Sequence, residues 1–370
     1  MKSSKQSGEG RSLIKVVFRY LASSIMLIVS IIASIALILT LIAPTVDPSV
    51  SWIFPILGLI APAVYIANLI LALFWIIKWK WLYAIPMVII LMCGVNRISL
   101  FVNMNFTTNY GLDSHKKLPT VMSYNVRNFY NDDKQWADEM SPYLEEQKPD
   151  IICFQEYTDV VKRFSKEMKK SLNKLNKAEF KPLAIYSRYP IIRKENIFKD
   201  AKKEEMKRAM WADIVIQKDT IRVFNCHLHS TTISAEDNDY LTSKQLVKDT
   251  LRNNKLRNMI SRFNNSSKER SKQIDTITMV ISKSPYPVVV CGDFNDTPMS
   301  HTYNVMSRGL KDAFQESGNG YSYTFRGFYN TLRIDYILVG EGITPYNYMV
   351  DKETLFSDHL PIMTQIKIEK

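Results

Sequence analysis

The sequence predicts an α/β domain that is preceded by a bundle of transmembrane α-helices. Hydrophobic residues make up 46% of the 370 residues, but the long uncharged apolar runs lie within the first hundred. Beyond Asn103 the pattern changes to short β-rich runs that alternate with polar helical segments, which is typical of an α/β domain. This change divides the chain into a membrane module over 1–103, a linker over 104–117 and a second domain over 118–370.

Three apolar segments, near 21–43, 52–77 and 81–103, are expected to be membrane spans. A helix needs about 20 apolar residues to cross the hydrocarbon core, and the first two segments reach that length without a charged residue. Arg97 interrupts the third segment, but an arginine near a helix end can extend its head group to the interface. The first segment is longer than the apolar part of a signal peptide, and no small-residue cleavage site follows it.

The flanking charges predict the orientation of these spans. Basic residues precede the first segment, and Lys78 and Lys80 lie between the second and third, whereas the loop with Asp47 carries no basic residue. Because basic loops stay in the cytoplasm, we expect a multi-pass protein of a bacterial plasma membrane with a cytoplasmic N-terminus. Three crossings place the large domain outside. If the third segment does not cross, that domain faces the cytoplasm.

Charge and cysteine content exclude some classes of protein. The net charge is +12, but residues 104–370 hold 40 Lys/Arg and 34 Asp/Glu, a net of +6. This domain attracts anions modestly, without the dense basic stripe of a dedicated nucleic-acid-binding protein. The four cysteines lack metal-ligand spacing, so we expect small buried hydrophobic residues rather than zinc ligands. Residues 231–275 are polar and basic, which indicates solvated surface helices; the alternative is a basic lid beside a functional site.

Polar clusters follow or open several of the strand-like runs. Each cluster taken alone fits a strand cap, a surface acid or a turn. Together they predict one site, because the ends of neighbouring strands meet at a sheet edge. The clusters are Ser123-Tyr124-Asn125, Gln155-Glu156, His227-Leu228-His229, Gly292-Asp293-Phe294-Asn295, Ile334-Asp335-Tyr336 and Ser357-Asp358-His359-Leu360-Pro361.

The order of these clusters resembles the endonuclease/exonuclease/phosphatase superfamily, which includes deoxyribonuclease I, exonuclease III, neutral sphingomyelinases and inositol polyphosphate 5-phosphatases. The resemblance covers nearly all of 118–370 and none of the apolar segments. It implies a four-layer α/β-β/α sandwich, in which two packed mixed sheets are flanked by helices, with the site at one end. Histidine at position 227 favours the deoxyribonuclease I-like and sphingomyelinase-like branches.

Phosphoester hydrolysis requires that charge on the non-bridging oxygens be stabilised and that water be activated. A hard cation held by carboxylates does the first, and Mg²⁺, or Mn²⁺ in its place, prefers a few carboxylates together with waters and substrate oxygens. Glu156 is the leading candidate ligand, Asp358 is the second, and Asn125 is expected to assist beside them.

The resemblance also implies catalytic roles. Asp293 and Asn295 would orient the attacking water and the phosphate. His359 would act as general base or phosphate contact, held by Asp335 in an acid–imidazole pair that fixes its tautomer and orientation. His227 would contact the scissile phosphate or protonate the leaving oxygen.

Two further residues are candidates for substrate binding. Arg188 lies in Ser187-Arg188-Tyr189-Pro190, which resembles a family element, and a surface arginine before a turn is the equal alternative. His229 shares a face with His227 if strand alternation continues, and otherwise lines only the rim.

These observations predict a membrane-anchored, metal-dependent phosphodiesterase that acts by in-line attack of an activated water, with nucleic acid as substrate. One alternative is a phospholipid or sphingolipid phosphodiesterase or phosphatase. Another is a non-catalytic membrane protein that binds a phosphorylated ligand. The expected partners are the bilayer and a phosphoester substrate, either nucleic acid or a lipid head group; no protein partner is inferred. A lipid enzyme should expose apolar residues at the rim of its site, whereas a nuclease should show a basic groove there.

Overall fold

The computed structural model describes most of both predicted units. The predicted linker lies largely outside the described residues. These residues are 3–105, 118–131, 134–135, 139–157, 171–199, 208–231 and 250–369.

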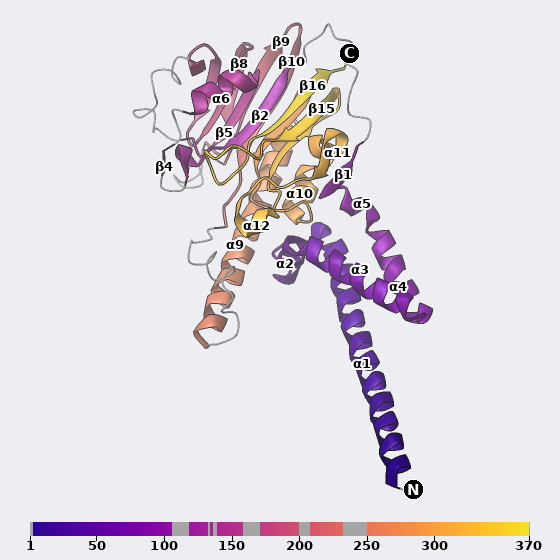
Figure 1. Cartoon of the computed structure of the whole chain (residues 1–370). Coiled ribbons are helices and arrows are strands. Elements are labelled where there is room, and N and C mark those ends of the chain that lie inside the picture. The colour runs from indigo at the N-terminus through magenta and orange to yellow at the C-terminus, as the bar shows by residue number, and fades with distance from the viewer. Residues whose placement is uncertain are drawn as a thin grey trace.

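Two six-stranded sheets form the centre of the C-terminal domain (Figure 1). The first sheet contains β2 (Thr120–Asn125), β5 (Ile151–Gln155), β6 (Asn176–Phe180), β7 (Leu183–Ser187), β15 (Ile343–Val350) and β16 (Ile362–Ile368). The second contains β8 (Ile191–Asn196), β9 (Ala209–Ile216), β10 (Asp219–His227), β11 (Val288–Asp293), β12 (Lys311–Asp312) and β14 (Asp335–Val339).

Both sheets are mixed. Their strand orders are β15-β16-β2-β5-β7-β6 and β12-β14-β11-β10-β9-β8. β2 runs parallel to β5, and β10 runs parallel to β11, whereas the other pairs among the described strands are antiparallel. The predicted pair of packed mixed sheets is therefore confirmed.

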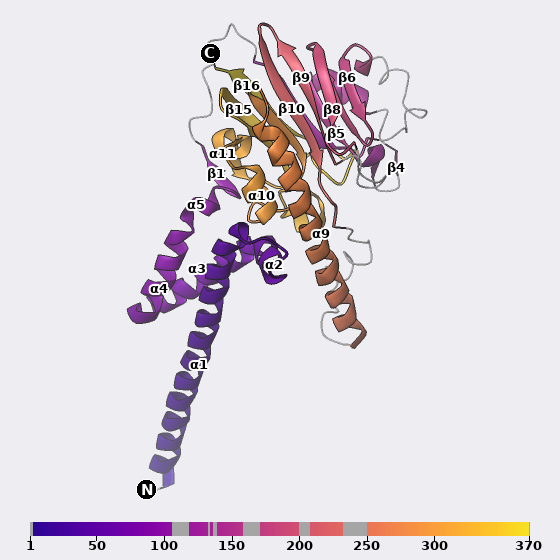
Figure 2. The same ribbon diagram turned by 180° about the vertical axis from the view of Figure 1, so that it is seen from behind.

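Three apolar cores separate four layers, because successive strand residues point to opposite faces of a sheet. The central core lies between the sheets and includes Val121 and Val223. Outside the second sheet, α9 (Thr250–Ser282) and α10 (His301–Met306) bury a further core, and Figure 2 shows α9 along this face. Outside the first sheet, α6 (Met140–Gln147) covers the third core.

The cysteines behave largely as small hydrophobic residues. Cys153, Cys226 and Cys291 are buried in these cores, Cys93 is exposed in the N-terminal module, and all four are free thiols. The absence of zinc-like spacing therefore agrees with what the three buried side chains do in the fold.

Shorter elements complete the described chain. The N-terminal module contains α1 (Ser3–Ile42), η1 (Ala43–Thr45), α2 (Ile53–Leu59), α3 (Ala61–Ile77), α4 (Trp81–Cys93), α5 (Val95–Ile98) and β1 (Val102–Met104). The C-terminal domain adds η2 (Arg127–Phe129), β3 (Tyr130–Asn131), β4 (Lys134–Gln135), α11 (Ala313–Ser317), β13 (Asn319–Tyr321) and α12 (Gly327–Asn330).

The N-terminal module differs from the predicted bundle of three spans. Among the described helices, one is long and apolar enough to cross a membrane by itself, over Val17–Thr45, and a signal sequence near an N-terminus passes the same test. The second predicted span is bent by 73° between α2 and α3. The break falls at Ile60, and Pro62 stands at the start of α3, where a missing N–H costs little.

The third predicted span is too short to cross as one helix. α4 has 13 residues, which gives about 20 Å at about 1.5 Å per residue, against about 30 Å for the hydrocarbon core. The chain then passes Gly94 and the short α5, and by Val102 it is extended. The apolar composition of this region predicts neither the early end of α4 nor the bend at Ile60.

Polar side chains join the apolar helices of the module. The indole Nε1 of Trp75 donates to Ser30 Oγ at 2.8 Å, and Asn68 Nδ2 donates to the Ala33 carbonyl at 2.9 Å. Both contacts hold α3 against α1. Hydrogen bonds of this kind contribute to helix association where the surroundings are apolar.

The module docks directly on the C-terminal domain. β1 pairs antiparallel with β13, so the predicted boundary at residue 103 lies inside a strand that joins the two units. The Thr297 hydroxyl donates to the Gly58 carbonyl at 3.0 Å, and a Cβ at Gly58 would collide with the Met299 carbonyl. Only glycine therefore permits this close approach of α2 to the loop after β11.

Candidate active site

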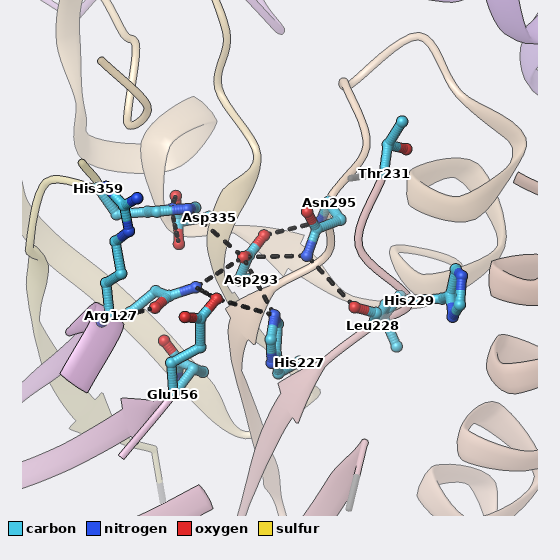
Figure 3. Close-up of polar contacts among 12 residues, drawn as sticks. Arg127, Glu156, His227, Leu228, His229, Thr231, Asp293, Asn295, Asp335 and His359 are labelled. Carbon is cyan, nitrogen blue, oxygen red and sulfur yellow. Dashed lines mark hydrogen bonds and ion pairs between the residues drawn. The ribbon is translucent and has the colours of Figure 1, made fainter. Parts of the chain in front are cut away.

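The polar clusters lie at one common end of the two sheets. In the second sheet His227 pairs with Asp293, and Asp293 pairs with Asp335. In the first sheet Asn125 pairs with Gln155, which directly precedes Glu156. The strand register thus carries these side chains to one edge, where Figure 3 shows several of them converging.

The backbone at these strand ends is unusual. Glu156 and Asn295 have φ values of 50° and 53°, in the left-handed region that few non-glycine residues adopt. Such conformations cluster at functional sites, where surrounding contacts hold them. Gly292 has φ 146°, and a Cβ there would collide with the Cys226 carbonyl, so glycine is required directly before Asp293.

Asp293 is the centre of the hydrogen-bond network. Its Oδ2 accepts from Asn125 Nδ2 and from Asn295 Nδ2, each at 3.0 Å, and its Oδ1 accepts from the Asn295 backbone N–H at 2.8 Å. Asn125 Nδ2 also donates to Glu156 Oε1 at 3.1 Å within the first sheet, so the Asn125 amide joins Glu156 to Asp293 of the second sheet. Burial raises the pKa of the Asp293 carboxyl against the opposing effect of His359.

The two histidines of the site have opposite electrostatic environments. Burial lowers the pKa of His227 to about 4, although Asp293 opposes this change. Burial also acts to lower the pKa of His359, but the Asp335 and Asp293 carboxylates outweigh it and raise the value to about 10. At neutral pH His227 is therefore neutral and His359 is an imidazolium.

Asp335 and His359 form the predicted acid–imidazole pair. His359 Nδ1 lies 3.0 Å from Asp335 Oδ2, which leaves Nε2 directed toward Asp293 Oδ2 at 3.7 Å. The Asp335 backbone N–H donates to Thr324 Oγ1 at 3.0 Å and fixes the start of β14. The pair presents one imidazole nitrogen to the centre of the site.

Oxygen donors fit a hard divalent cation at this end of the sheets. Glu156 and Asp293 bring carboxylates to the two sides of the Asn125 amide. His227 Nε2 is buried without a hydrogen-bond partner among the described residues, 3.6 Å from Glu156 Oε1 and 3.7 Å from Asp293 Oδ2. Carboxylate-rich sites of this kind suit Mg²⁺ or Mn²⁺.

A second group of ligand atoms comes from Asp293, Asp335 and His359, which lie within 4.8 Å of one another. All three residues are buried. Because Asp335 is already hydrogen-bonded to His359, the cluster suits an acid–imidazole pair better than a cage for a hard cation.

Several residues of the site open onto one cavity of about 360 Å³, here called the strand-end cavity. Glu156, Asp293 and His359, which come from three of the predicted clusters, all line this cavity. Its polar lining is completed by Arg127, Ser230, Thr231, Asn295, Asp296, Thr297 and Asp358.

Asp358 lines the strand-end cavity but pairs with Arg127, whose Nη1 lies 3.3 Å from Asp358 Oδ2. The second predicted metal ligand is therefore partly neutralised by a cation. Arg127, the first residue of η2, could not be identified from the sequence because it stands two residues beyond the Ser123-Tyr124-Asn125 cluster.

The structure does not bring Arg188 into the site. Its Nε lies 2.7 Å from Asp150 Oδ1, and Asp150 directly precedes β5, whereas Glu156 directly follows it. β7 runs antiparallel to β5, so the residue after β7 falls at the opposite end of the sheet. The structure therefore places Arg188 away from the other candidate residues, and its substrate contact stays a prediction.

His229 also lies apart from the network. β10 ends at His227, so the alternation that would place both histidines on one face stops there. Figure 3 shows the His229 side chain directed away from Asp293. Its backbone is held instead, since His229 N–H donates to Gln273 Oε1 at 2.9 Å and its carbonyl accepts from Arg270 at 3.0 Å.

Two buried side-chain hydrogen bonds support the site, and no local sequence pattern predicts either of them. Gln155 Nε2 donates to Asn225 Oδ1 at 2.7 Å and joins the sheets below the strand ends. Arg270 of α9 donates from Nε to Asp296 Oδ2 at 3.1 Å, which fixes the loop after Asp293. Both links join segments far apart in the chain, so they become visible only in the fold.

Family models match two parts of the chain. Residues 122–359 match the model described as the endonuclease/exonuclease/phosphatase family. Residues 23–101 match a model described as a domain of unknown function. The comparison with curated proteins found no match.

Three similar solved structures illustrate the comparison. An endonuclease/exonuclease/phosphatase from Bacteroides vulgatus is 17% identical, with a TM-score of 0.48, over 69% of this chain and 100% of that chain. A mannosyl-6-phosphatase from Bacteroides thetaiotaomicron is 19% identical, with a TM-score of 0.47, over 68% and 100%. D. rerio TDP2 in complex with a single-strand DNA product is 17% identical, with a TM-score of 0.48, over 68% and 100%.

Proposed function

Because the chain belongs to the endonuclease/exonuclease/phosphatase family, we propose that it is a membrane-anchored phosphoesterase that requires a divalent metal and hydrolyses phosphodiester bonds. Members of this family are hydrolases of phosphoester bonds. The observation that carries the proposal is the convergence of Asn125, Glu156, Asp293 and His359 at one end of both sheets. These are the groups that in-line attack by water requires.

The chain's own residues divide the work as follows. Asp293, positioned by Asn295, accepts a proton from the attacking water, whose oxygen forms the new bond to phosphorus as the bond to the leaving oxygen breaks. The His359 imidazolium, held by Asp335, contacts the negatively charged phosphate. A pKa near 4 makes His227 a poor acid at neutral pH, so its role is contact with the phosphate.

The metal ligands are assigned to the oxygen donors around Asn125. Glu156 is the principal ligand, Asp293 lies beside it, and Asp358 lines the same cavity. A bound Mg²⁺ or Mn²⁺ supplies charge stabilisation at the phosphoryl oxygens.

The membrane topology follows from the number of crossings. α1 crosses once, with its basic N-terminus in the cytoplasm. α3 and α4 form a hairpin that returns to the side from which it started, whether or not its tip at Lys78 and Lys80 reaches the opposite face. The C-terminal domain is therefore assigned to the outside of the membrane, as the flanking charges predict. The domain limits proposed are 1–103, 104–117 and 118–370.

The rim of the strand-end cavity favours a lipid phosphodiester over nucleic acid. Leu59, Phe263, Phe325, Phe328 and Leu332 line the cavity beside the polar cluster, and Arg127 is already paired with Asp358. Apolar residues at the rim are the feature expected of a lipid enzyme. A nucleic-acid enzyme instead requires cationic side chains along the phosphate backbone.

The test is turnover by the purified full-length protein with Mg²⁺, with Mn²⁺ or with EDTA. The substrates are methyl 4-nitrophenyl phosphate, a DNA oligonucleotide and phosphatidylcholine vesicles. We expect hydrolysis that EDTA abolishes and that Glu156→Gln reduces at limiting Mg²⁺. Absence of turnover on every substrate with either metal refutes the proposal.

A further inference from the structure

A second cavity adjoins the strand-end cavity and is lined mostly by apolar side chains. It measures about 640 Å³ and is here called the apolar groove. Both cavities share part of their lining, so one molecule can occupy them together. The shared residues are Leu59, Thr231, Phe263, Thr297, Phe328 and Leu332.

Segments from three distant parts of the sequence build the apolar groove. Residues 56–66 contribute the end of α2 and the start of α3, and residues 328–333 contribute most of α12 and the turn after it. The third wall is the N-terminal half of α9, which packs against α2 (Figures 1 and 2).

The wall from α9 is apolar despite the polar composition of that helix. Leu256, Met259, Ile260 and Phe263 follow the i, i+3, i+4, i+7 spacing of one helical face, and all four line the groove. The prediction of solvated surface helices over 231–275 is therefore wrong for 256–263, and its residues 232–249 lie outside the described part of the chain. The described part of α9 instead forms an apolar wall beside the site.

Several lining residues are exposed, although apolar side chains of this size favour burial. Ile60 is 44% exposed, Ile66 is 57% exposed and Leu256 is 44% exposed. Contiguous exposed apolar surface marks a binding or membrane-contacting site. Residues 60–66 also belong to the bent apolar helix pair of the N-terminal module, so the groove continues from membrane-contacting surface to the strand-end cavity.

We propose that the apolar groove binds a hydrocarbon chain of a membrane lipid whose phosphodiester lies in the strand-end cavity. This proposal rests on the phosphoesterase activity proposed above and specifies its substrate class. The surroundings of the apolar groove indicate which molecule binds there. One end of the groove joins the strand-end cavity, where the phosphate is proposed to bind, and one side is formed by α2 and α3 of the N-terminal module. The N-terminal module therefore forms part of the substrate site as well as the anchor.

The test uses a series of soluble phosphodiesters, the methyl, butyl and octyl esters of 4-nitrophenyl phosphate. The full-length protein is purified in glyco-diosgenin, a detergent without a flexible alkyl chain, and assayed with Mg²⁺. Each buried methylene strengthens binding about fourfold at most. We expect kcat/KM to rise about 10- to 200-fold from the butyl to the octyl ester, mainly through KM.

Two substitutions that fill the groove provide the critical comparison. Ala63 and Leu256 line the groove and are both exposed, so Ala63→Trp and Leu256→Trp occupy the groove without disturbing a packed core. We expect each to reduce the octyl-to-butyl ratio of kcat/KM at least about tenfold. The matched controls are Ala67→Trp and Met279→Trp, on the same two helices at exposed positions outside the groove, and these should retain the wild-type ratio.

A second readout does not depend on turnover. A phosphatidylcholine that carries a diazirine in its acyl chain is photolysed with the full-length protein in vesicles, and the cross-linked residues are located by mass spectrometry. We expect labels within 56–66 and 256–263, reduced by Leu256→Trp. Labels confined to α1 and α4 would show that lipid chains do not enter the groove.

The outcomes separate the two proposals. Hydrolysis of the methyl ester with no gain from longer chains refutes the lipid groove and leaves the phosphoesterase intact. A gain that survives both tryptophan substitutions refutes the groove as its cause. If no ester is hydrolysed, the proposed function fails and the cross-linking pattern alone decides whether the groove binds lipid.

Discussion

The strand-end cavity and the apolar groove lie side by side but are built in different ways. Strand ends supply the polar cluster around Asp293, and a dense hydrogen-bond network holds it. Helices and one turn supply the groove, and its lining side chains are mostly apolar. The family fold therefore accounts for the proposed chemistry, while the N-terminal module and α9 account for the proposed choice of substrate.

The largest effect on activity should come from a substitution in the polar cluster of the strand-end cavity. His359→Ala removes the imidazolium that Asp335 holds toward Asp293, and we expect kcat for methyl 4-nitrophenyl phosphate to fall about 10²- to 10³-fold. The matched control is His301→Ala, a half-buried histidine on α10 outside the strand-end cavity. Equal activity of His359→Ala and wild type would refute the catalytic assignment.

A smaller effect is expected from the buried link beneath the strand ends. Asn225→Leu leaves Gln155 Nε2 and the Phe154 and Ala184 carbonyls without their amide partner. Unsatisfied buried groups cost about 1–3 kcal/mol each, so we expect the free energy of unfolding to fall by about 3 kcal/mol.

Chemical denaturation of the full-length protein measures this loss. The control is Asn176→Leu, an exposed position on the edge strand β6, which should change stability by less than about 0.5 kcal/mol. Similar losses in both variants would show that the link between the sheets contributes little.

The smallest effect should come from the contact between the two regions. Thr297→Val removes the hydrogen bond to the Gly58 carbonyl and should lower stability by about 1 kcal/mol. Thr364→Val is the control, because it removes a similar hydrogen bond to the Tyr346 carbonyl, far along the first sheet. Only Thr297→Val should also weaken the preference for the octyl ester; the same preference in both variants would show that this contact does not shape the groove.

Much of the polar site could be predicted from the sequence because its residues sit in short motifs beside recognisable strands. Asp293 and Glu156 directly close or follow apolar runs, and Asp335 opens one. The placement of Arg188 failed because no local pattern reveals that β7 runs antiparallel to β5. The placement of His229 failed because strand alternation stops two residues earlier.

The groove and the module could not be predicted in the same way. Uniform apolar composition gives no sign of the 73° bend at Ile60 or of the early end of α4. The groove combines residues 56–66, 256–263 and 328–333, whose proximity depends on the docking of the module. Local sequence patterns predict where strands end, whereas a surface between docked units is visible only in the three-dimensional structure.

The most direct test of the central claim is the position of a bound divalent cation. Crystals of the full-length protein grown with Mn²⁺ reveal the ion by its anomalous scattering. We predict a Mn²⁺ peak in the strand-end cavity, ligated by Glu156 beside Asn125 and Asp293, and its loss in Glu156→Gln. A peak bound by Asp335 and His359 instead, or no peak in the strand-end cavity, would contradict the account.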